Sequence, residues 1–268
     1  MKSIEYTKFF AITAAASAIS IAPPSYAGNA CEVKSGRATA ALVELYTSEG
    51  CSSCPPADQQ LSRLRQHSDV NAVIVPLALH VSYWDAIGWK DVFAQKTFDA
   101  RQSELLANKK KRVVYTPQFF VNGVELRGWR NDLAGQIRQI NAKPAPVTIT
   151  LKTDSPRSGQ LVVHAEVHAQ NSDINGALYL AISESALTSR VTRGENSGVT
   201  LKHDNTVRVL FAPVQMVRGS GYMQQAIEIP AGWKREDLQV VAFVQDQKSG
   251  DVLQAVSTAQ CNQGRGQG

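Results

Sequence analysis

The first half of the sequence alternates between two hydrophobic patterns. Short apolar runs at residues 40–46 and 70–81 predict buried strands, the second of them buried on both faces. Apolar residues at helical spacing predict a helix over residues 55–68, with prolines in its first turn, and another over residues 92–110. Residues 82–91 predict an ordered loop between them. The chain therefore opens as strand, helix, strand, helix, and this crossover should be right-handed.

A hairpin and a third helix complete this half. Asn122-Gly123 stands between apolar stretches within residues 113–126, a strong signal for two antiparallel strands joined by a tight turn. Apolar residues within 131–141 keep the spacing of an amphipathic helix. The predicted order over residues 28–143 is therefore β-α-β-α-β-β-α, an α/β domain.

The second half has the pattern of an all-β domain. Residues 144–146 hold two prolines and predict a linker. Short apolar runs, several of them alternating with polar residues, then recur between turn residues. They predict an antiparallel β-sandwich of about seven strands over residues 147–260, before a tail at 261–268. Residues 193–198 predict a turn-rich loop packed against the first domain. The predicted strands are 147–151, 161–168, 178–183, 206–211, 225–229, 240–245 and 252–256.

The N-terminus and the composition bear on the compartment. Residues 1–27 combine early lysines, an apolar segment too short for a membrane span and a small-residue cleavage site. They predict a secretory signal peptide, and a periplasmic or secreted mature protein without stable membrane insertion. The formal charge of +5, from 28 basic and 23 acidic residues, is mild. The dense basic cluster at residues 109–112 predicts the solvated end of a helix, so no nucleic-acid partner is expected.

The chemistry is concentrated in two cysteines at the first strand-to-helix junction. Cys51 and Cys54 immediately precede the helix that the prolines begin. Free N–H groups and the helix dipole favour an anion there, so the thiol pKa of the outer cysteine, Cys51, should fall below the usual value of about 8.5. Cys51 is the predicted nucleophile, and Cys54 would resolve a mixed disulfide. A static disulfide and a metal site remain alternatives, although zinc would need further ligands and no second CxxC motif occurs.

The other two cysteines, Cys31 and Cys261, lie near the ends of the mature chain. An even number of cysteines in an oxidising compartment favours pairing. We therefore expect a Cys31–Cys261 disulfide beside the Cys51–Cys54 pair. Chain-entropy arithmetic for so long a loop gives an upper guide of about 5 kcal/mol.

The order of elements resembles the thioredoxin superfamily, with the CxxC after the first strand and Thr116-Pro117 before the third as paired landmarks. The resemblance implies a cis proline beside the CxxC, with Thr116 holding the backbone of an extended substrate. More narrowly, the sequence resembles a secreted bacterial family of thioredoxin-like proteins of unknown function. Ser82 departs from the Asp expected there, and Gly50 from the Trp of familiar thioredoxins. The matching stretches are 44–58, 79–85, 88–91, 115–118, 192–198 and 253–256.

Four further side chains near the pair are candidate site residues. Glu44, in the first predicted strand, is a candidate proton relay to the resolving cysteine, with a structural carboxylate as the alternative. His80 is a candidate for tuning the nucleophilic thiolate, with a hydrogen-bonded structural histidine as the alternative. Trp84 and Trp89 are candidates for a substrate groove. Buried aromatic packing, with Asp85 as a helix cap, is the simpler interpretation.

Three histidines of the second half are candidate metal ligands. His164 and His168 are four residues apart and would share one strand face, and with His203 they are candidate copper ligands. Ordinary surface imidazoles are the simpler interpretation. We therefore predict no metal site, and the CxxC chemistry requires no organic cofactor.

These observations predict an exported thiol–disulfide oxidoreductase. Its partners would be protein or small-molecule thiols and disulfides, with an envelope protein exchanging electrons with the CxxC pair. One competing hypothesis is a non-catalytic thioredoxin-like binding module with a static disulfide, which presents its β domain to an envelope partner. Another places Cu(I) on the two thiolates, because soft sulfur ligands suit that ion.

Overall fold

The computed structural model describes Met1, residues 30–64 and residues 73–263. The predicted signal peptide, apart from Met1, and the predicted end of the first helix at residues 66–68 lie outside these residues. None of the described helices is both long enough and apolar enough to span a bilayer.

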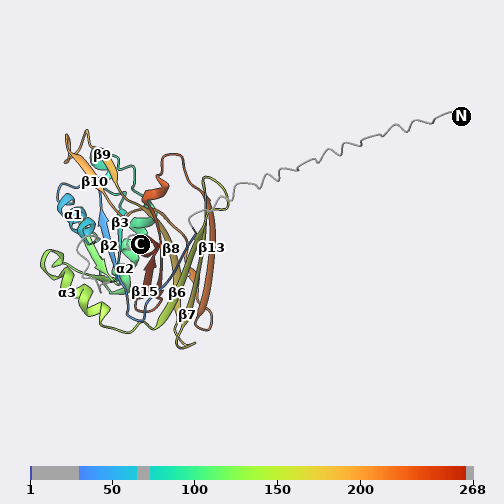
Figure 1. The fold of residues 1–268 in the computed structure, drawn as a ribbon. Coiled ribbons are helices and arrows are strands. Elements are labelled where there is room, and N and C mark those ends of the chain that lie inside the picture. The colour runs from blue at the N-terminus through green and yellow to red at the C-terminus, as the bar shows by residue number, and fades with distance from the viewer. Residues whose placement is uncertain (2–29, 65–72, 264–268) are drawn as a thin grey trace.

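A nine-stranded mixed sheet runs through the middle of the described part of the chain (Figure 1). Its parallel pairs lie at the centre, and the outer pairs are antiparallel. In order across the sheet the strands are β15 (Val252–Ser257), β14 (Leu238–Asp246), β8 (Gly176–Glu184), β11 (Thr206–Leu210), β3 (Ile74–His80), β2 (Ala41–Thr47), β4 (Gln118–Val121) and β5 (Val124–Glu125), with β12 (Val214–Gln215) paired to β8.

The sheet crosses the domain boundary predicted at residues 144–146. β11, from the second half, lies parallel to β3 from the first half, with Thr206 opposite Ala78. The backbone groups along the edge of β3 thus find partners in the second half, where an unpaired strand edge would otherwise be exposed. The strands of the second half pair with one another in antiparallel fashion, as expected, and the parallel pairing occurs where the second half joins the first.

Three helices cover the two faces of the first-half strands. α1 (Pro55–Arg63) and α3 (Trp129–Asn141) pack Leu61 and Leu133 against the face of β2 that carries Val43. α2 (Lys96–Asn108) packs Phe98 against the opposite face, which carries Tyr46. Successive side chains of a strand point to opposite faces, so neighbouring residues of β2 meet different helices. From β2 to α3 the order is strand, helix, strand, helix, strand, strand, helix.

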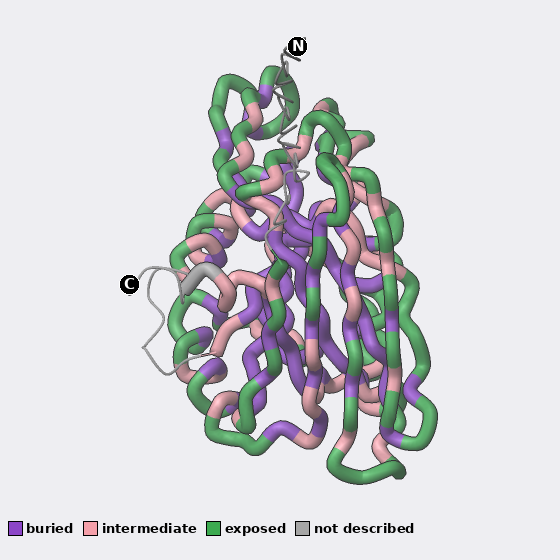
Figure 2. The backbone as a smooth tube through the Cα atoms, turned by 45° about the vertical axis from the view of Figure 1, so that its right-hand side comes forward, coloured by how far each residue is buried: buried purple, intermediate pink, exposed green. Residues whose placement is uncertain are grey.

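A second, four-stranded sheet packs on β8 and β14. Leu178 and Leu180 point from β8 into this sandwich core, while Tyr179 points to the α2 side. Figure 1 shows α1 and α3 at one side of the molecule and the second sheet at the other, and Figure 2 shows the buried residues concentrated along the strands between them. In order, the strands of the second sheet are β1 (Cys31–Lys34), β6 (Val147–Asp154), β7 (Gln160–Ala169) and β13 (Ser220–Glu228).

The remaining elements are short. A hairpin that the sequence did not predict joins β9 and β10 and reaches α1. The predicted turn at Asn122 and Gly123 does connect β4 to β5, and both residues have a positive φ, of 46° and 80°. A side chain at Gly123 would collide with the carbonyl of Gly250, so glycine is required there. The short elements are β9 (Leu187–Arg190), β10 (Thr200–His203), η1 (Asp85–Ile87), η2 (Arg235–Asp237) and α4 (Ala259–Gln263).

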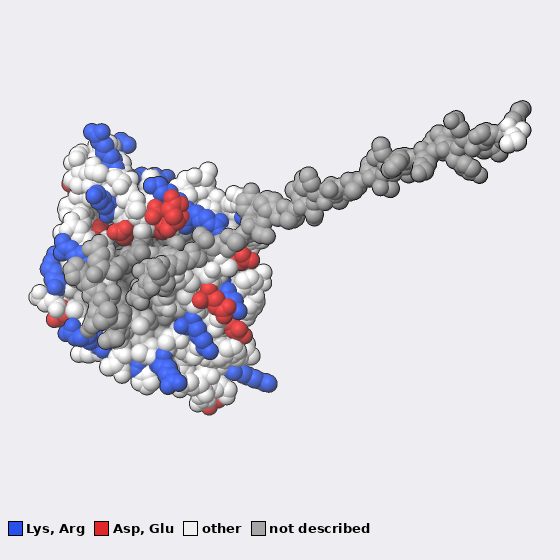
Figure 3. All heavy atoms as spheres, viewed as in Figure 1, with Lys and Arg blue, Asp and Glu red and all other residues white. Residues whose placement is uncertain are grey.

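Charged side chains of both signs are interspersed on the face shown in Figure 3. The basic cluster at residues 109–112 follows the end of α2, where a helix end was predicted. Lys109 lies 2.5 Å from a carboxylate oxygen of Asp251, and Lys111 lies 2.7 Å from one of Glu125. These two lysines are therefore engaged in ion pairs with acidic side chains of the same chain.

Candidate functional site

The two cysteines of the CxxC motif form a disulfide at the start of α1. Cys54 is the N-cap residue, and its carbonyl oxygen accepts hydrogen bonds from the N–H groups of Ala57 and Asp58, at 2.8 and 3.1 Å. Cys51 and Cys54 are both 0% exposed. The expectation that Cys51 is the outer, more accessible cysteine is therefore wrong, because both cysteines are equally buried.

Residues 191–199, which connect β9 to β10, lie against residues 49–52 and are called the cover loop below. The side-chain amide of Asn196 donates to the carbonyl oxygens of Glu49 and Cys51, at 2.8 and 3.0 Å. The carboxylate of Glu195 accepts from the N–H and the hydroxyl of Ser52, at 3.0 and 2.7 Å. These two hydrogen bonds lower the pKa of Glu195 below its ordinary value. The loop that the sequence placed against the first domain thus lies on the CxxC segment itself.

Trp84 connects the CxxC segment to Thr116. Its indole N–H donates to the Thr116 hydroxyl at 2.7 Å, and a Cβ added at Gly50 would lie 3.4 Å from the Cβ of Trp84. The Thr116-Pro117 peptide bond is cis, and both residues are half-buried. The structure therefore brings these predicted substrate residues to the same end of the sheet as the disulfide.

The other predicted tryptophan and its neighbour have structural contacts. Trp89 donates its indole N–H to the carboxylate of Glu49 at 2.7 Å. Asp85 does not cap its helical turn through its side chain; it accepts a hydrogen bond from the N–H of Asp91 at 3.1 Å. Gly194 of the cover loop packs on Trp89, since a Cβ there would lie 3.2 Å from the Cβ of Trp89.

A cluster of buried charged and polar groups lies next to the CxxC segment. Nδ1 of His80 donates to Oδ2 of Asp91 at 2.6 Å, and the same oxygen accepts the N–H of Glu49 at 2.9 Å. Nε2 of His203 lies 3.1 Å from Oε1 of Glu49, and the His80 and His203 rings are 5.0 Å apart. All four side chains are buried. The predicted residue His80 is therefore part of a larger network than the sequence indicated.

His80 and Asp91 each favour the ionised form of the other. Burial alone would lower the pKa of His80, but the Asp91 carboxylate raises it above the ordinary value. Burial alone would raise the pKa of Asp91, but the His80 cation and the hydrogen bonds lower it. Each partner thus holds the other in its ionised form.

Asp58 is the first acidic residue after Cys54, the predicted resolving cysteine, in the sequence. It lies four residues after Cys54 on α1, and residues at this spacing share one helix face. Burial raises the pKa of Asp58, while the nearby imidazoles of His80 and His203 act against this rise. Within the described residues, Oδ1 of Asp58, Nε2 of His80 and Nδ1 of His203 are buried without a hydrogen-bond partner. Such atoms are usually satisfied by enclosed water or by a transient proton donor or acceptor.

Glu44 does not lie beneath the disulfide, which corrects its predicted role as a proton relay. Its carboxylate binds Arg101 of α2 through two hydrogen bonds, at 2.6 and 3.0 Å. The Arg101 guanidinium also lies about 5 Å from the ring centres of Tyr179 and Phe243. Because α1 covers the other face of β2, Glu44 points away from Cys54 and serves as a buried structural carboxylate.

The three histidines considered as copper ligands are not brought together. Nδ1 of His164 lies 2.9 Å from the Tyr222 hydroxyl, and Nε2 of His168 lies 2.9 Å from Glu166. His203 belongs to the buried cluster described above. Among the residues that the structure describes, no group of three or more His, Cys, Asp or Glu side chains is arranged to hold a metal ion.

Sequence reasoning missed most of the buried cluster. Asp58 carried a usable signal, because its helical spacing from Cys54 places it on the covered face of α1. No local pattern linked the other three residues to the cluster. Glu49 and Asp91 lie in two different loops, and His203 lies in the second half of the chain. Only the tertiary fold brings them beside His80.

The second disulfide joins Cys31 of β1 to Cys261 of α4. It therefore ties the first described strand to the last described helix. Two disulfides in one chain fit a non-cytoplasmic, oxidising compartment.

The fold and the site define a mostly β protein in which helices α1, α2 and α3 flank a mixed sheet and a CxxC disulfide begins the first of them. The chain belongs to a family of proteins of unknown function, DUF1223, whose sequence profile matches residues 42–245. A crystal structure of a protein from Agrobacterium tumefaciens is similar, with a TM-score of 0.60 and 24% identity, covering 83% of this chain and 95% of that one. HBP35 of Porphyromonas gingivalis is similar with a TM-score of 0.61 and 14% identity, covering 83% and 76%. These likenesses show a shared fold, and no curated protein matches the chain.

Proposed function

We propose that this protein is an exported thiol–disulfide oxidoreductase, with Cys51 and Cys54 as the redox pair and residues 41–141 as a thioredoxin-like unit. The observation that carries the proposal is the position of the disulfide at the N-terminus of α1, one helical turn before the half-buried Asp58, whose Oδ1 atom is buried. The helix N-terminus stabilises a thiolate, and an acid with a raised pKa can give or take the proton that exchange requires. A disulfide that only supports the fold needs neither feature.

The exchange proceeds in two steps. A substrate thiolate attacks the sulfur of Cys51, the Cys51–Cys54 bond breaks, and Cys54 leaves as a thiolate that takes a proton from Asp58. A second substrate thiolate then attacks the substrate sulfur of the mixed disulfide and releases Cys51 as a thiolate. The substrate has lost two electrons and the CxxC pair has gained them. Reduction of a substrate disulfide runs through the same steps in reverse, and an envelope redox partner restores the pair.

Substrate access requires the cover loop to move. Both cysteines are fully covered, and an attacking thiolate must approach the Cys51 sulfur along the disulfide bond. Release of the Asn196 and Glu195 contacts would open this approach. Trp84 and Thr116, which lie beside the opened segment, are then placed to contact the substrate chain.

The test is the reduction potential of the Cys51–Cys54 couple in glutathione buffers, measured with the rate of insulin reduction and of scrambled-ribonuclease reactivation. A redox enzyme should have a potential between about −270 and −120 mV, the range spanned by thioredoxin and DsbA, and should turn over at least one substrate. A couple that resists reduction below about −300 mV, with no turnover, would contradict the proposal.

The covered state favours a second candidate function, a binding module with a static disulfide. Four hydrogen bonds hold the cover loop on the CxxC segment, and neither cysteine is exposed. In that case the β-sandwich would contact an envelope partner and the disulfide would support the loop. The same measurement separates the two functions, because the module predicts a potential below about −300 mV.

A further inference from the structure

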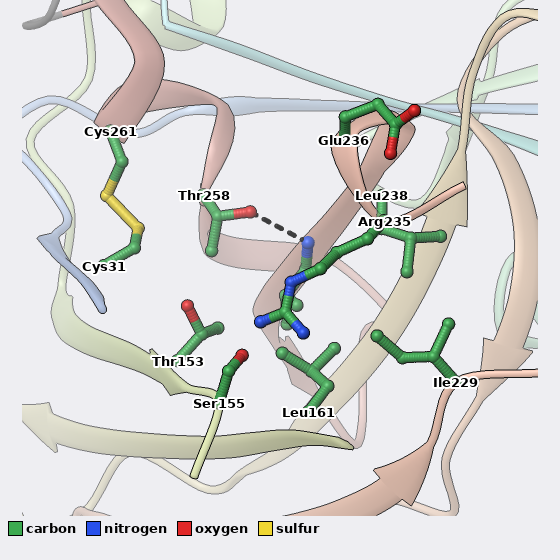
Figure 4. Close-up of a pocket in the computed structure, with 11 residues that line it drawn as sticks. Cys31, Thr153, Ser155, Leu161, Ile229, Arg235, Glu236, Leu238, Thr258 and Cys261 are labelled. Carbon is green, nitrogen blue, oxygen red and sulfur yellow. Dashed lines mark hydrogen bonds between the residues drawn. A yellow bond between two sulfur atoms is a disulfide. The ribbon is translucent and has the colours of Figure 1, made fainter. Parts of the chain in front are cut away.

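A pocket of about 360 Å³ lies at the end of the β-sandwich, beside the Cys31–Cys261 disulfide (Figure 4). Its walls come from both sheets and from η2, and none of the CxxC site residues lines it. The volume lies within the range of about 300–1,000 Å³ that is typical of small-molecule sites. The pocket is therefore separate from the redox site proposed above.

One side of the pocket is polar. Ser155 is 8% exposed, and its hydroxyl is buried without a hydrogen-bond partner among the described residues. In Figure 4, Thr153, Ser155 and the guanidinium of Arg235 lie around the same space. A buried hydroxyl without a partner is unfavourable, so this side is incomplete without a further polar group.

The Arg235 side chain has unused binding capacity. Its one described hydrogen bond is a long contact of 3.4 Å from Nη1 to the carbonyl oxygen of Gln160, and among the described residues it forms no ion pair. Its carboxylate neighbour Glu236 lies at the far side of the pocket from Thr153 and Ser155 in Figure 4. The guanidinium thus has no carboxylate partner among the described residues, and several of its N–H donors are available on the polar side.

The pocket also has apolar walls. They are formed by Leu161, Ile229, Leu238 and Val240, which belong to or pack against the sandwich core. A ligand that fills the pocket would bury hydrocarbon against these side chains. The pocket therefore combines one cationic, hydroxyl-bearing end with a hydrocarbon wall.

We propose that this pocket binds a small amphipathic carboxylate, with its head group on Arg235 and Ser155 and its hydrocarbon body against Leu161, Ile229 and Leu238. A guanidinium binds a carboxylate through two parallel hydrogen bonds, and the Ser155 hydroxyl gains the acceptor that it lacks. This inference does not rest on the redox function.

The test is to titrate octanoate into the protein with both disulfides formed. Binding is measured by calorimetry and by the NMR shifts of the backbone amides. Saturable binding that shifts the amides of pocket residues is expected. Arg235→Gln should weaken it by about tenfold or more, since it removes a charge-assisted bidentate contact. Ser155→Ala should weaken it by a smaller factor and leave the protein at least as stable, because it removes an unpaired buried hydroxyl.

The matched control is Arg157→Gln. Arg157 is an exposed arginine that is paired with Glu228 and does not line the pocket, so its loss should leave octanoate affinity unchanged. Octylamine, with the same hydrocarbon chain and the opposite charge, should not compete. Equal binding of octanoate to Arg235→Gln and to the unmodified protein, or shifts confined to residues outside the pocket, would overturn the inference. So would the absence of saturable binding.

Discussion

The two disulfides of this protein lie in opposite surroundings. Cys51 and Cys54 are three positions apart, fully covered, and close to a cluster of buried acids and imidazoles. Cys31 and Cys261 are 230 positions apart, partly exposed, and line a pocket with hydroxyls, apolar side chains, Arg235 and the exposed Glu236. Closing a long loop restricts the unfolded chain more than closing a short one. The Cys31–Cys261 disulfide is therefore expected to stabilise the fold. The Cys51–Cys54 disulfide lies near groups that can donate and accept protons.

Removal of each disulfide in turn gives the largest expected effects. Cys51→Ser with Cys54→Ser should reduce thiol–disulfide exchange to background, while lowering the unfolding free energy by no more than about 2 kcal/mol. Cys31→Ser with Cys261→Ser should keep exchange but lower the unfolding free energy by up to about 5 kcal/mol. Insulin turbidity and urea unfolding measure the two properties. The contrast between the two disulfides would be wrong if the Cys51→Ser, Cys54→Ser variant kept its exchange activity. It would also be wrong if a folded Cys31→Ser, Cys261→Ser variant lost its exchange activity.

Two acidic side chains sharpen the comparison, because Asp58 lies on the helix that follows the CxxC motif and Glu44 does not. Asp58→Asn should slow exchange at pH 7 by about 100-fold, the lower part of the range for general acid–base catalysis. It should also leave the protein as stable or more stable at that pH, since burial raises the pKa of Asp58 and so disfavours its charged form. Stopped-flow reduction and urea unfolding provide the two readouts.

Glu44→Gln is the matched control for Asp58. It removes the charge that neutralises the buried guanidinium of Arg101, so the unfolding free energy should fall by about 3–5 kcal/mol. Exchange by the protein that remains folded should be unchanged, because Glu44 faces α2. If Glu44→Gln slowed exchange as much as Asp58→Asn does, the assignment of the proton relay to Asp58 would be wrong.

The contacts of the cover loop give a moderate effect. Asn196→Ala removes two hydrogen bonds that hold the loop on Glu49 and Cys51. At about 1 kcal/mol for each bond, reduction of the disulfide by a phosphine should accelerate by about 10- to 30-fold. Ser197→Ala is the control, since among the described residues its hydroxyl donates only to the Thr192 carbonyl within the loop. Equal reduction rates for all three proteins would show that the loop does not limit access to the disulfide.

The sequence was informative where local rules act. Pro55 and Pro56 marked the start of α1, and Asn122-Gly123 marked the hairpin turn, because backbone conformation at those positions depends on the residues themselves. The seven runs predicted in the second half correspond to β6, β7, β8, β11, β13, β14 and β15. Hydrophobic runs of that length carry the strand period directly in the sequence.

The rest depended on contacts between distant segments. The parallel pairing of β11 with β3 joins the two halves, and no local pattern in either strand specifies its neighbour. Glu44 illustrates the same limit within the site. Its position in a buried strand was predictable, but the side of the sheet on which it lies determines whether it meets Cys54 or Arg101. A shift of one residue along a strand reverses that answer.

The buried His80–Asp91 pair gives the smallest expected effect, a pH dependence of stability. The pKa of His80 in the folded protein is above its ordinary value, so its contribution is fully present below the ordinary pKa of about 6.5 and is lost as the pH rises through the folded value. The difference in unfolding free energy between the unmodified protein and His80→Gln should therefore be larger at pH 6 than at pH 9. Urea unfolding of the two proteins at a series of pH values measures this difference. A His80 difference that stays constant or grows toward pH 9 would mean that this histidine is neutral in the folded protein, and its role beside the disulfide would then be that of a hydrogen-bonding group without charge.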